Sequence, residues 1–315
     1  MSSCIVCKEK IFSLLFKTRD RMFDIPAFFD VKRCHGCGLV FLDPQPSQEV
    51  LRKHYPRQQY YSYKMSIKGL SGLISKFRSY LIRHYYEPTI LSRIFSVLVQ
   101  GVPAIPKKPK SISAKILDVG CGSGTTLALL KKLDWDVYGL EIDKNAVKVA
   151  RERGLVNVKL GGYEKIANFP DNYFDSIRLY HVIEHIPNPR ACLQLIYQKL
   201  KPGGEVILGT PNIDSAVSKL FGKFWYNLDI PRHLFLFSPN TLSTIVKTEG
   251  FSQLSVVFCS SDGLGRSIIY TLNEIFKKKM DTNKYTLLFV ILYPIEWILD
   301  KLKVGDIVIL RGIKK

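Results

Sequence analysis

The sequence predicts an α/β protein built on a largely parallel sheet with helices on both faces. Residues 115–124, Lys-Ile-Leu-Asp-Val-Gly-Cys-Gly-Ser-Gly, lead a short apolar strand into a glycine turn. An apolar helix over 125–133 follows, and a second strand over 136–140 ends in Glu141. Strand, helix and strand in this order form the repeating unit of a parallel sheet.

The glycine turn predicts a ligand site. Gly120, Gly122 and Gly124 leave the turn without side chains, so backbone N–H groups and the positive end of the following helix are open to a ligand. Glu141, at the tip of the next strand, is placed to accept both hydroxyls of a ribose. Together these features indicate a cofactor that contains a nucleoside.

The glycine spacing decides between cofactors. A dinucleotide fingerprint needs a third glycine where this chain has Thr125 or Leu127. The pattern Asp-x-Gly-x-Gly-x-Gly instead resembles the class I S-adenosylmethionine-dependent methyltransferases, which have a Rossmann-like, seven-stranded domain. The resemblance implies that the methionine part of S-adenosylmethionine lies against the turn, with Glu141 on the ribose. The residues it assigns to the cofactor are Asp118, Gly120, Cys121, Gly122, Gly124, Glu141, Ile142, Tyr163, Glu164 and Tyr180.

The resemblance continues to about Phe251, through the segments 169–175, 200–204 and 210–212. It is strongest to small-molecule methyltransferases, including the ubiquinone-biosynthesis type and the enzymes of surface-glycan gene clusters. One segment departs from the family, which often has an acidic residue near the adenine where this chain reads Gly161-Gly162-Tyr163-Glu164. Stacking of Tyr163 on the base and a hydrogen bond from Glu164 both stay open.

Two cysteine pairs predict a structural metal. Cys4-x-x-Cys7 and Cys34-x-x-Cys37 each place two thiolates on one tight turn. Two such knuckles make a tetrahedral site of four sulfurs, which favours zinc. Four unrelated reduced thiols are the alternative.

The net charge of +19 is unevenly spread. Residues 64–115 hold ten Lys and Arg against a single acid, and their middle, Gly72–Val99, reads as basic amphipathic helices. A second apolar stretch, Tyr285–Leu299, is flanked by lysines. Basic residues beside apolar ones suit an anionic membrane surface, whereas ordinary core helices are the alternative. RNA is a less favoured partner, because no aromatic platform for bases is apparent.

Two polar clusters are candidates for catalysis, since the crevice of an α/β sheet opens at the carboxyl ends of its strands. The first follows the strand over 174–180 and contains His181, Glu184 and His185. The second contains His233. Methyl transfer often requires removal of a proton, for which histidine is suited, so His181 is the first candidate base and His233 the second. The ubiquinone-type resemblance also implies a divalent ion near Glu184 and His185.

The chain is therefore expected to have three parts. A zinc-knuckle lobe covers 1–45, a basic helical segment and linker covers 46–112, and the methyltransferase domain covers 113–315 with a helical insertion at about 260–305. No apolar run is long enough to cross a bilayer and no secretory pattern is present, so we expect a cytoplasmic protein. Peripheral attachment to the inner face of the membrane is the other option. The expected acceptor is a small molecule: a glycan, a lipid-linked compound or a quinone-like compound. An RNA methyltransferase and a non-catalytic cofactor-binding protein are the alternatives.

Overall fold

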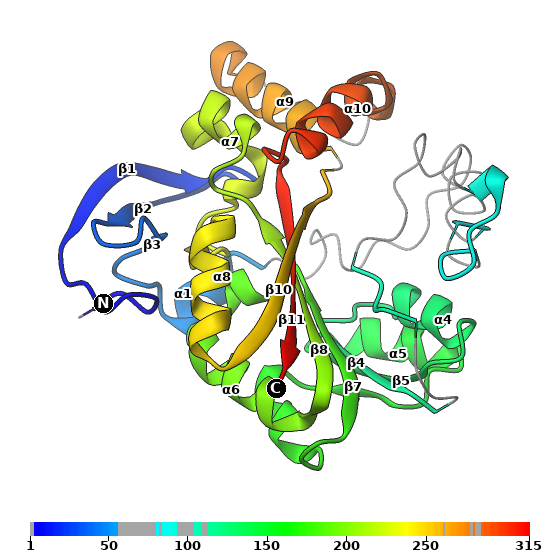
Figure 1. Ribbon diagram of the computed structural model, residues 1–315. Helices are drawn as coiled ribbons and strands as arrows, with labels where there is room; N and C mark the ends of the chain where they lie inside the picture. Colours follow the sequence, from blue (N-terminus) through cyan, green and yellow to red (C-terminus); the bar gives the residue numbers. More distant parts are fainter. Residues whose placement is uncertain are drawn as a thin grey trace.

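The computed structural model describes residues 3–55, 80–81, 84–92, 104–108, 113–260, 262–277, 280 and 285–315. Most of the predicted amphipathic segment Gly72–Val99 lies outside these residues. Two sheets organise the described chain, a seven-stranded sheet and a four-stranded one (Figure 1).

The seven-stranded sheet has the order β10-β11-β8-β7-β4-β5-β6. β11 runs antiparallel to both of its neighbours, and the other pairs are parallel. The order reverses between β4 and β7, and open α/β sheets bind their ligands at the carboxyl ends of the strands at such a reversal. The strands are β4 (Lys115–Val119), β5 (Asp136–Glu141), β6 (Val158–Leu160), β7 (Phe174–Tyr180), β8 (Leu200–Pro211), β10 (Phe251–Phe258) and β11 (Ile307–Lys314).

Helices cover both faces of this sheet, as the α/β prediction requires. Ile116 packs with α4 (Thr125–Lys131) and α5 (Lys144–Glu152), whereas its neighbour Leu117 packs with α6 (Pro189–Lys199) and α8 (Pro239–Thr248). Successive side chains of a strand point to opposite faces, so β4 contributes to two cores. The fold is that of a Rossmann-like, seven-stranded α/β domain, which confirms the predicted fold class.

The four-stranded sheet joins the N-terminus to the main domain. Its order is β1 (Phe12–Asp20), β2 (Ile25–Cys34), β3 (Val40–Leu42) and β9 (Phe235–Leu236). The last strand comes from far along the chain, and Val40 pairs with Leu236. The N-terminal residues share one buried cluster with the main domain. The lobe therefore completes its sheet and core with residues of that domain.

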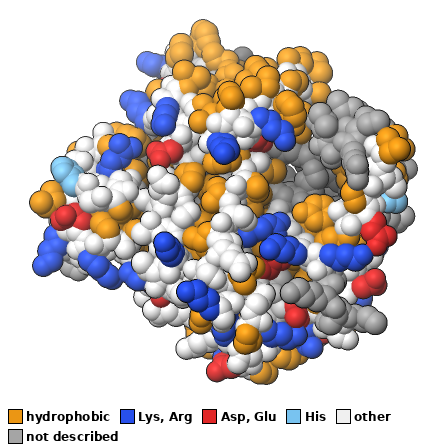
Figure 2. Space-filling model, viewed as in Figure 1, with side chains coloured by type: hydrophobic (Ala, Val, Ile, Leu, Met, Phe, Trp, Pro, Cys, Tyr) orange, Lys and Arg blue, Asp and Glu red, His pale blue; other side chains and the backbone are white. Residues whose placement is uncertain are grey.

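A helical hairpin lies between β10 and β11, formed by α9 (Gly263–Phe276) and α10 (Thr286–Lys301). α7 (Ala216–Phe221) packs on α9. Figure 2 shows apolar side chains gathered over these helices. No helix in the described part of the chain is long and apolar enough to cross a membrane. The exposed apolar residues of the hairpin are Ile275, Phe276, Leu287, Val290, Ile291, Ile295 and Ile298.

Two shorter elements lie near the lobe and the linker. α1 (Gln48–Lys53) follows β3, with Ser47 as its N-cap. Residues 104–108 pack against the large sheet, since Ala104 and Ile105 are buried and Arg311 donates to the carbonyl of Ile105. This part of the expected cationic linker is therefore fixed to the domain.

Candidate active site

The glycine turn after β4 has the conformation that its sequence predicts. Gly120, Gly122 and Gly124 have φ values of 72°, 54° and 73°, in the left-handed region that side chains disfavour. A Cβ atom on Gly120 would lie 2.5 Å from Val182, so this glycine also permits a close contact. A Cβ on Gly122 would meet nothing within 4 Å. The turn is therefore packed at its base and open at Gly122, where a ligand has room.

Glu141 lies directly against this turn. Its Oε2 accepts a hydrogen bond of 2.8 Å from the Gly122 amide, and its Oε1 accepts one of 2.9 Å from the Asp143 amide. The side chain is buried, which raises the pKa of its carboxyl, while the backbone amides oppose that shift. Each oxygen retains a lone pair, so a fixed carboxylate at the turn is ready to accept the hydroxyls of a ribose.

Asp118 has a different environment from the one expected. Its carboxylate is buried and forms a 2.7 Å ion pair with Arg178 of β7, which also donates to the Ala104 carbonyl. The pair joins β4 to β7 beneath the crevice. This geometry favours a positioning role for Asp118 over direct contact with a ligand. Arg178, the one basic residue of β7, is the signal that sequence reasoning missed.

The other predicted cofactor residues lie at or shortly after the carboxyl ends of β4, β5, β6 and β7. Ile142 is 74% exposed beside Glu141, and Glu164 is also exposed. Tyr163 is half-buried, and nothing in its contacts decides between it and Glu164 as the partner of the adenine. Cys121 is buried and Tyr180 packs on Gly209 of β8. Cofactor contacts by these side chains stay predictions.

A buried carboxylate lies just after β7, one of the two strands between which the strand order reverses. Glu184 is fully buried, and neither of its oxygens has a hydrogen-bond partner in the described structure. The nearest donor is Nδ1 of His181, which lies 3.3 Å from Oε1. His181 itself has a φ of 56°, unusual for a residue with a side chain, and its side chain is 34% exposed. Strained backbone and unpaired buried oxygens are both typical of functional sites.

Two more histidines complete this cluster. Nδ1 of His185 lies 2.9 Å from the Arg232 carbonyl, and Nδ1 of His233 lies 2.8 Å from the Asn227 carbonyl. A carbonyl only accepts, so each Nδ1 carries the proton and each Nε2 keeps a free lone pair. The available atoms of Glu184, His185 and His233 lie within 4.8 Å of one another. Such a set can bind a divalent cation or receive a proton.

The electrostatics of the cluster keep Glu184 ionised. Burial alone would raise its pKa, but the surrounding imidazoles of His181, His185 and His233 hold it at about 2. Burial and the neighbouring His185 lower the pKa of His233 to about 4, so His233 is neutral at pH 7. Glu184 is therefore a buried anion, and the neutral His233 beside it can accept a proton. The described residues supply too few hydrogen-bond donors for the Glu184 carboxylate.

Arg232 connects this cluster to the N-terminal lobe. Its guanidinium is fully buried between Asp229 and Asp20, with contacts of 2.6 and 2.7 Å. Asp20 also lies 2.8 Å from Nδ1 of His54. The carboxylates raise the pKa of Arg232 above its usual range even though burial opposes them. Asp20 and His54 were not predicted, because their partner lies far away in the sequence.

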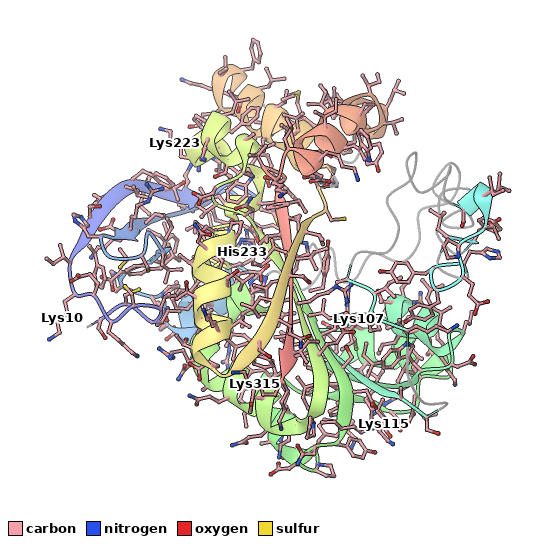
Figure 3. The ribbon with its side chains drawn as sticks, in the orientation of Figure 1. Lys10, Lys107, Lys115, Lys223, His233 and Lys315 are labelled. Carbon is pink, nitrogen blue, oxygen red and sulfur yellow. The ribbon has the colours of Figure 1, made fainter. Side chains whose placement is uncertain are left out.

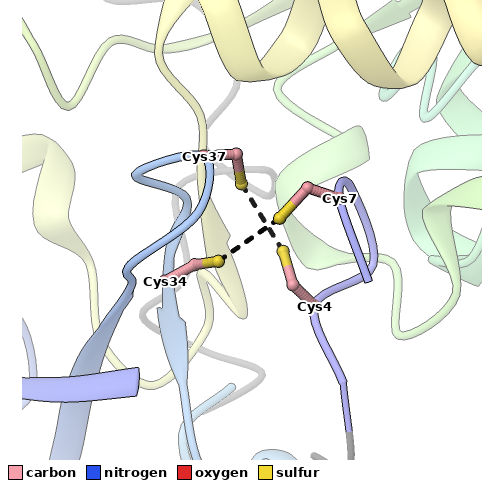
Figure 4. Close-up of side chains that lie close together, drawn as sticks. All are labelled: Cys4, Cys7, Cys34 and Cys37. Carbon is pink, nitrogen blue, oxygen red and sulfur yellow. Dashed lines mark hydrogen bonds between the residues drawn. The ribbon is translucent and has the colours of Figure 1, made fainter. Parts of the chain in front are cut away.

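The four N-terminal cysteines converge, as Figure 4 shows. The Sγ atoms of Cys4 and Cys37 are 3.5 Å apart, as are those of Cys7 and Cys34, and all four lie within 4.8 Å. Tetrahedral zinc with bonds of about 2.3 Å separates its sulfurs by about 3.8 Å. The two knuckles also match in backbone, since the Lys8 amide donates to the Cys4 carbonyl and the Gly38 amide to the Cys34 carbonyl. The donor set and its geometry therefore fit zinc.

Fold and glycine turn together match the class I S-adenosylmethionine-dependent methyltransferase domain that the sequence resembles. The profile of a family described as a methyltransferase domain matches residues 88–256, more than half of the chain. The protein belongs to this family.

The curated relatives that it matches are named for ubiquinone biosynthesis. A "Ubiquinone biosynthesis O-methyltransferase" from Xanthomonas oryzae pv. oryzae (strain PXO99A) is 34% identical over 112 residues, 34% of this chain and 47% of that protein. The protein of the same name from Xanthomonas campestris pv. campestris (strain B100) is 33% identical over an equal length. The chain spans about half the length of these relatives.

Two solved structures match part of this chain at low identity. A SAM-dependent methyltransferase from Thermotoga maritima, titled a possible histamine N-methyltransferase, is 18% identical, with 77% of this chain and 92% of that chain covered at a TM-score of 0.47. A SAM-dependent methyltransferase from Archaeoglobus fulgidus is 23% identical, with 77% and 98% covered at a TM-score of 0.47.

Proposed function

We propose that the protein transfers a methyl group from S-adenosylmethionine to a small-molecule acceptor. One observation carries the proposal: the glycine turn after β4 and the histidine–glutamate cluster after β7 flank the point where the strand order reverses. A cofactor on Gly122 and Glu141 and an acceptor on the cluster would meet in the crevice between them. S-adenosylmethionine supplies the methyl group on a sulfonium.

His181 is our candidate for the base. Nδ1 of His181 faces the Glu184 carboxylate, and this contact would orient the imidazole ring. Nδ1 would then carry the ring proton, so Nε2 would be free to accept a proton. Of the three histidines in the cluster, His181 follows the tip of β7 most closely, where an acceptor would approach. It would take the proton that the acceptor loses as the methyl group bonds to it. Glu184 would then stabilise the imidazolium.

We further propose that the acceptor is presented at an anionic membrane surface, as a lipid-linked compound would be. The α9–α10 hairpin supports this, since Leu287, Val290 and Ile291 on α10 are each at least 50% exposed. Lys277, Lys301 and Lys303 lie at the ends of the two helices and would meet anionic headgroups. A glycan carried on a lipid and a quinone-like compound both fit this arrangement.

We also propose that Cys4, Cys7, Cys34 and Cys37 hold one structural zinc. The lobe has a small core, and Arg190 of α6 donates to the carbonyl of Ile5 between the first two cysteines. A metal would hold the lobe in place at this contact, and it would thereby keep Asp20 in position to pair with Arg232.

The experiment is a labelled-methyl screen. The protein is incubated with S-adenosylmethionine carrying a radiolabelled methyl group and with separate lipid and water-soluble extracts, and the labelled product is followed. We expect label in a lipid-extractable small molecule, and we expect His181→Ala to lower the rate about 100-fold or more while cofactor binding is unchanged. Lys132→Ala, an exposed change on the far side of the sheet from the cluster, is the matched control. No label from wild-type protein in either extract, or equal rates for His181→Ala and wild type, would refute the proposal.

A further inference from the structure

The structure brings a third metal-binding side chain to the histidine–glutamate cluster after β7. The sequence resemblance implies a divalent ion near Glu184 and His185, which share one short helical turn, Ile183–His185. One ligand atom from each of these two residues and one from His233 lie within 4.8 Å of one another. His181 is outside this set, although it is closer in the sequence. The geometry therefore selects a histidine from a later segment of the chain.

Backbone hydrogen bonds hold His233 beside Glu184. The Leu234 amide donates to the Glu184 carbonyl over 2.9 Å, and the His233 amide donates to the Asp229 carbonyl over 3.1 Å. Nε2 of His233 lies 4.0 Å from Oε1 of Glu184. Two ligand atoms at about 2.1 Å from one cation are at most about 4.2 Å apart, so this separation allows both to bind the same ion. In Figure 3, His233 is labelled between the N-terminal strands and the strands of the large sheet.

Both imidazole rings are already held in the form that binds metals. Backbone carbonyls accept from Nδ1 of His185 and from Nδ1 of His233, so Nε2 of each ring keeps its lone pair. Histidines that bind metals usually donate their other ring N–H to a carbonyl or a carboxylate in this way. These contacts fix the orientation of each ring without help from a cation.

Glu184 is an anion that the described residues leave without a fixed cation. Both of its oxygens are buried without a hydrogen-bond partner, and its ion-pair contacts in the described part of the chain are with the imidazoles of His181 and His233. The Arg232 guanidinium is bound between two aspartates instead. Asp229 also faces His233, at 3.9 Å, but both of its oxygens accept hydrogen bonds from Arg232. A buried carboxylate without a cationic partner is costly, and a divalent cation would offset that cost.

We propose that Glu184, His185 and His233 together bind one divalent cation, with His233 and not His181 as the third ligand. The role of the site rests on the proposed methyl-transfer function: a bound cation would hold and polarise an oxygen of the acceptor. Two imidazole nitrogens and one carboxylate suit Mn²⁺ or Fe²⁺ better than Mg²⁺, which prefers oxygen ligands. Three protein ligands leave coordination positions open, as in catalytic metal sites. His181 stays outside the ligand set, as its proposed role as the base requires.

The test uses Mn²⁺ as the probe, because free Mn²⁺ gives an electron paramagnetic resonance signal that is lost when the ion binds. The full chain is dialysed free of loosely bound cations and then titrated. The four N-terminal cysteines should not compete, since thiolates select softer ions. We expect one site in wild type, and about tenfold or greater losses of affinity in His233→Ala and in Glu184→Gln. His181→Ala should bind Mn²⁺ about as tightly as wild type, and Mg²⁺ should displace Mn²⁺ only weakly.

Melting temperatures of the same samples give a second measurement. A cation that binds only the folded state raises the melting temperature, so Mn²⁺ should stabilise wild type but not His233→Ala. His84→Ala, which changes a half-buried histidine outside the cluster, is the control and should respond as wild type does. His185 is half-buried, so His185→Ala is expected to fold even if His233→Ala does not, and it should show the same loss of Mn²⁺ affinity.

Two results would overturn the proposal. One is a wild-type protein that binds no Mn²⁺, or binds it no better than His233→Ala and His185→Ala do. The other is an equal loss of affinity in His181→Ala and His233→Ala, which would contradict the assignment of the third ligand. Binding of S-adenosylhomocysteine is measured on every variant. If wild type binds it but not Mn²⁺, the cation site fails and the methyltransferase proposal stands; if wild type binds Mn²⁺ but not S-adenosylhomocysteine, the underlying function fails instead.

Discussion

Replacing Asp20 by Asn tests how the N-terminal lobe supports the histidine–glutamate cluster after β7. The Asp20 carboxylate is fully buried and accepts hydrogen bonds from Arg232 at 2.7 and 3.0 Å. It also accepts hydrogen bonds from the backbone amides of Met22 and Phe23, and its Oδ2 lies 2.8 Å from Nδ1 of His54. Asparagine has one acceptor oxygen instead of two, so its NH₂ group must face either Arg232 or another donor.

The expected cost follows from these contacts. At least one hydrogen bond to the Arg232 guanidinium is lost and the charge of the pair is removed, whereas Asp229 still partners the arginine. Breaking a buried ion pair costs about 3–5 kcal/mol. At about 2–4 °C per kcal/mol, the melting temperature should fall by about 6–20 °C. Because the Arg232 carbonyl holds His185, the rate of methyl transfer should fall as well, while affinity for S-adenosylhomocysteine stays near that of wild type.

Asp24→Asn is the matched control. Asp24 lies in the same hairpin and pairs with Arg19, but its side chain is 59% exposed, so its loss should cost less than about 1 kcal/mol. Thermal denaturation of the two variants compares the same substitution in buried and exposed settings. Equal melting temperatures for Asp20→Asn and Asp24→Asn would refute the role of the buried network.

Three other perturbations follow from the structure. Elemental analysis should find about one zinc per chain in wild type and none in Cys34→Ser. The substitution should loosen the N-terminal lobe but leave cofactor binding unchanged. A wild-type protein that holds no metal would contradict this prediction. Wild-type protein should sediment with anionic liposomes, and the double variant Leu287→Ser/Ile291→Ser should bind them more weakly. Val156→Ser, which changes an exposed apolar residue elsewhere on the surface, should leave the binding unchanged. Unchanged sedimentation of the double variant would exclude the hairpin as the contact. Burial raises the pKa of Glu296 to about 8, so its carboxyl binds a proton in the folded state that the unfolded state releases near pH 4.5. Stability should therefore fall by up to about 1.4 kcal/mol per pH unit between about pH 5 and 8, and Glu296→Gln should remove that slope in urea titrations. A slope that the substitution leaves intact would show that Glu296 is not its source.

The local parts of the fold are predictable from the sequence. The strand over 115–119, its glycine turn and the strand ending in Glu141 carry their own signals: apolar residues, left-handed glycines and a polar residue at the strand tip. The sequence also predicts the last two strands, over 252–259 and 306–311, and these lie within a few residues of β10 and β11. Each of these signals is contained within about ten consecutive residues.

The long-range contacts could not be predicted in the same way. Asp20 and Arg232 are 212 residues apart, and the sequence around either gives no sign of the other. β9 is only two residues long, and it has its place because β3 offers an edge to pair with. Asp118 has the expected position in the motif, but the contact that determines its role comes from Arg178 on the neighbouring strand.

The central claim is that the glycine turn and Glu141 bind S-adenosylmethionine, and calorimetry with S-adenosylhomocysteine and NAD tests it most directly. Wild type should bind S-adenosylhomocysteine at one site and show no heat with NAD. Glu141→Ala should weaken binding by about tenfold to a hundredfold, because charged hydrogen bonds of about 1.5–3 kcal/mol are lost. Tight binding of NAD with no response to S-adenosylhomocysteine would contradict the account.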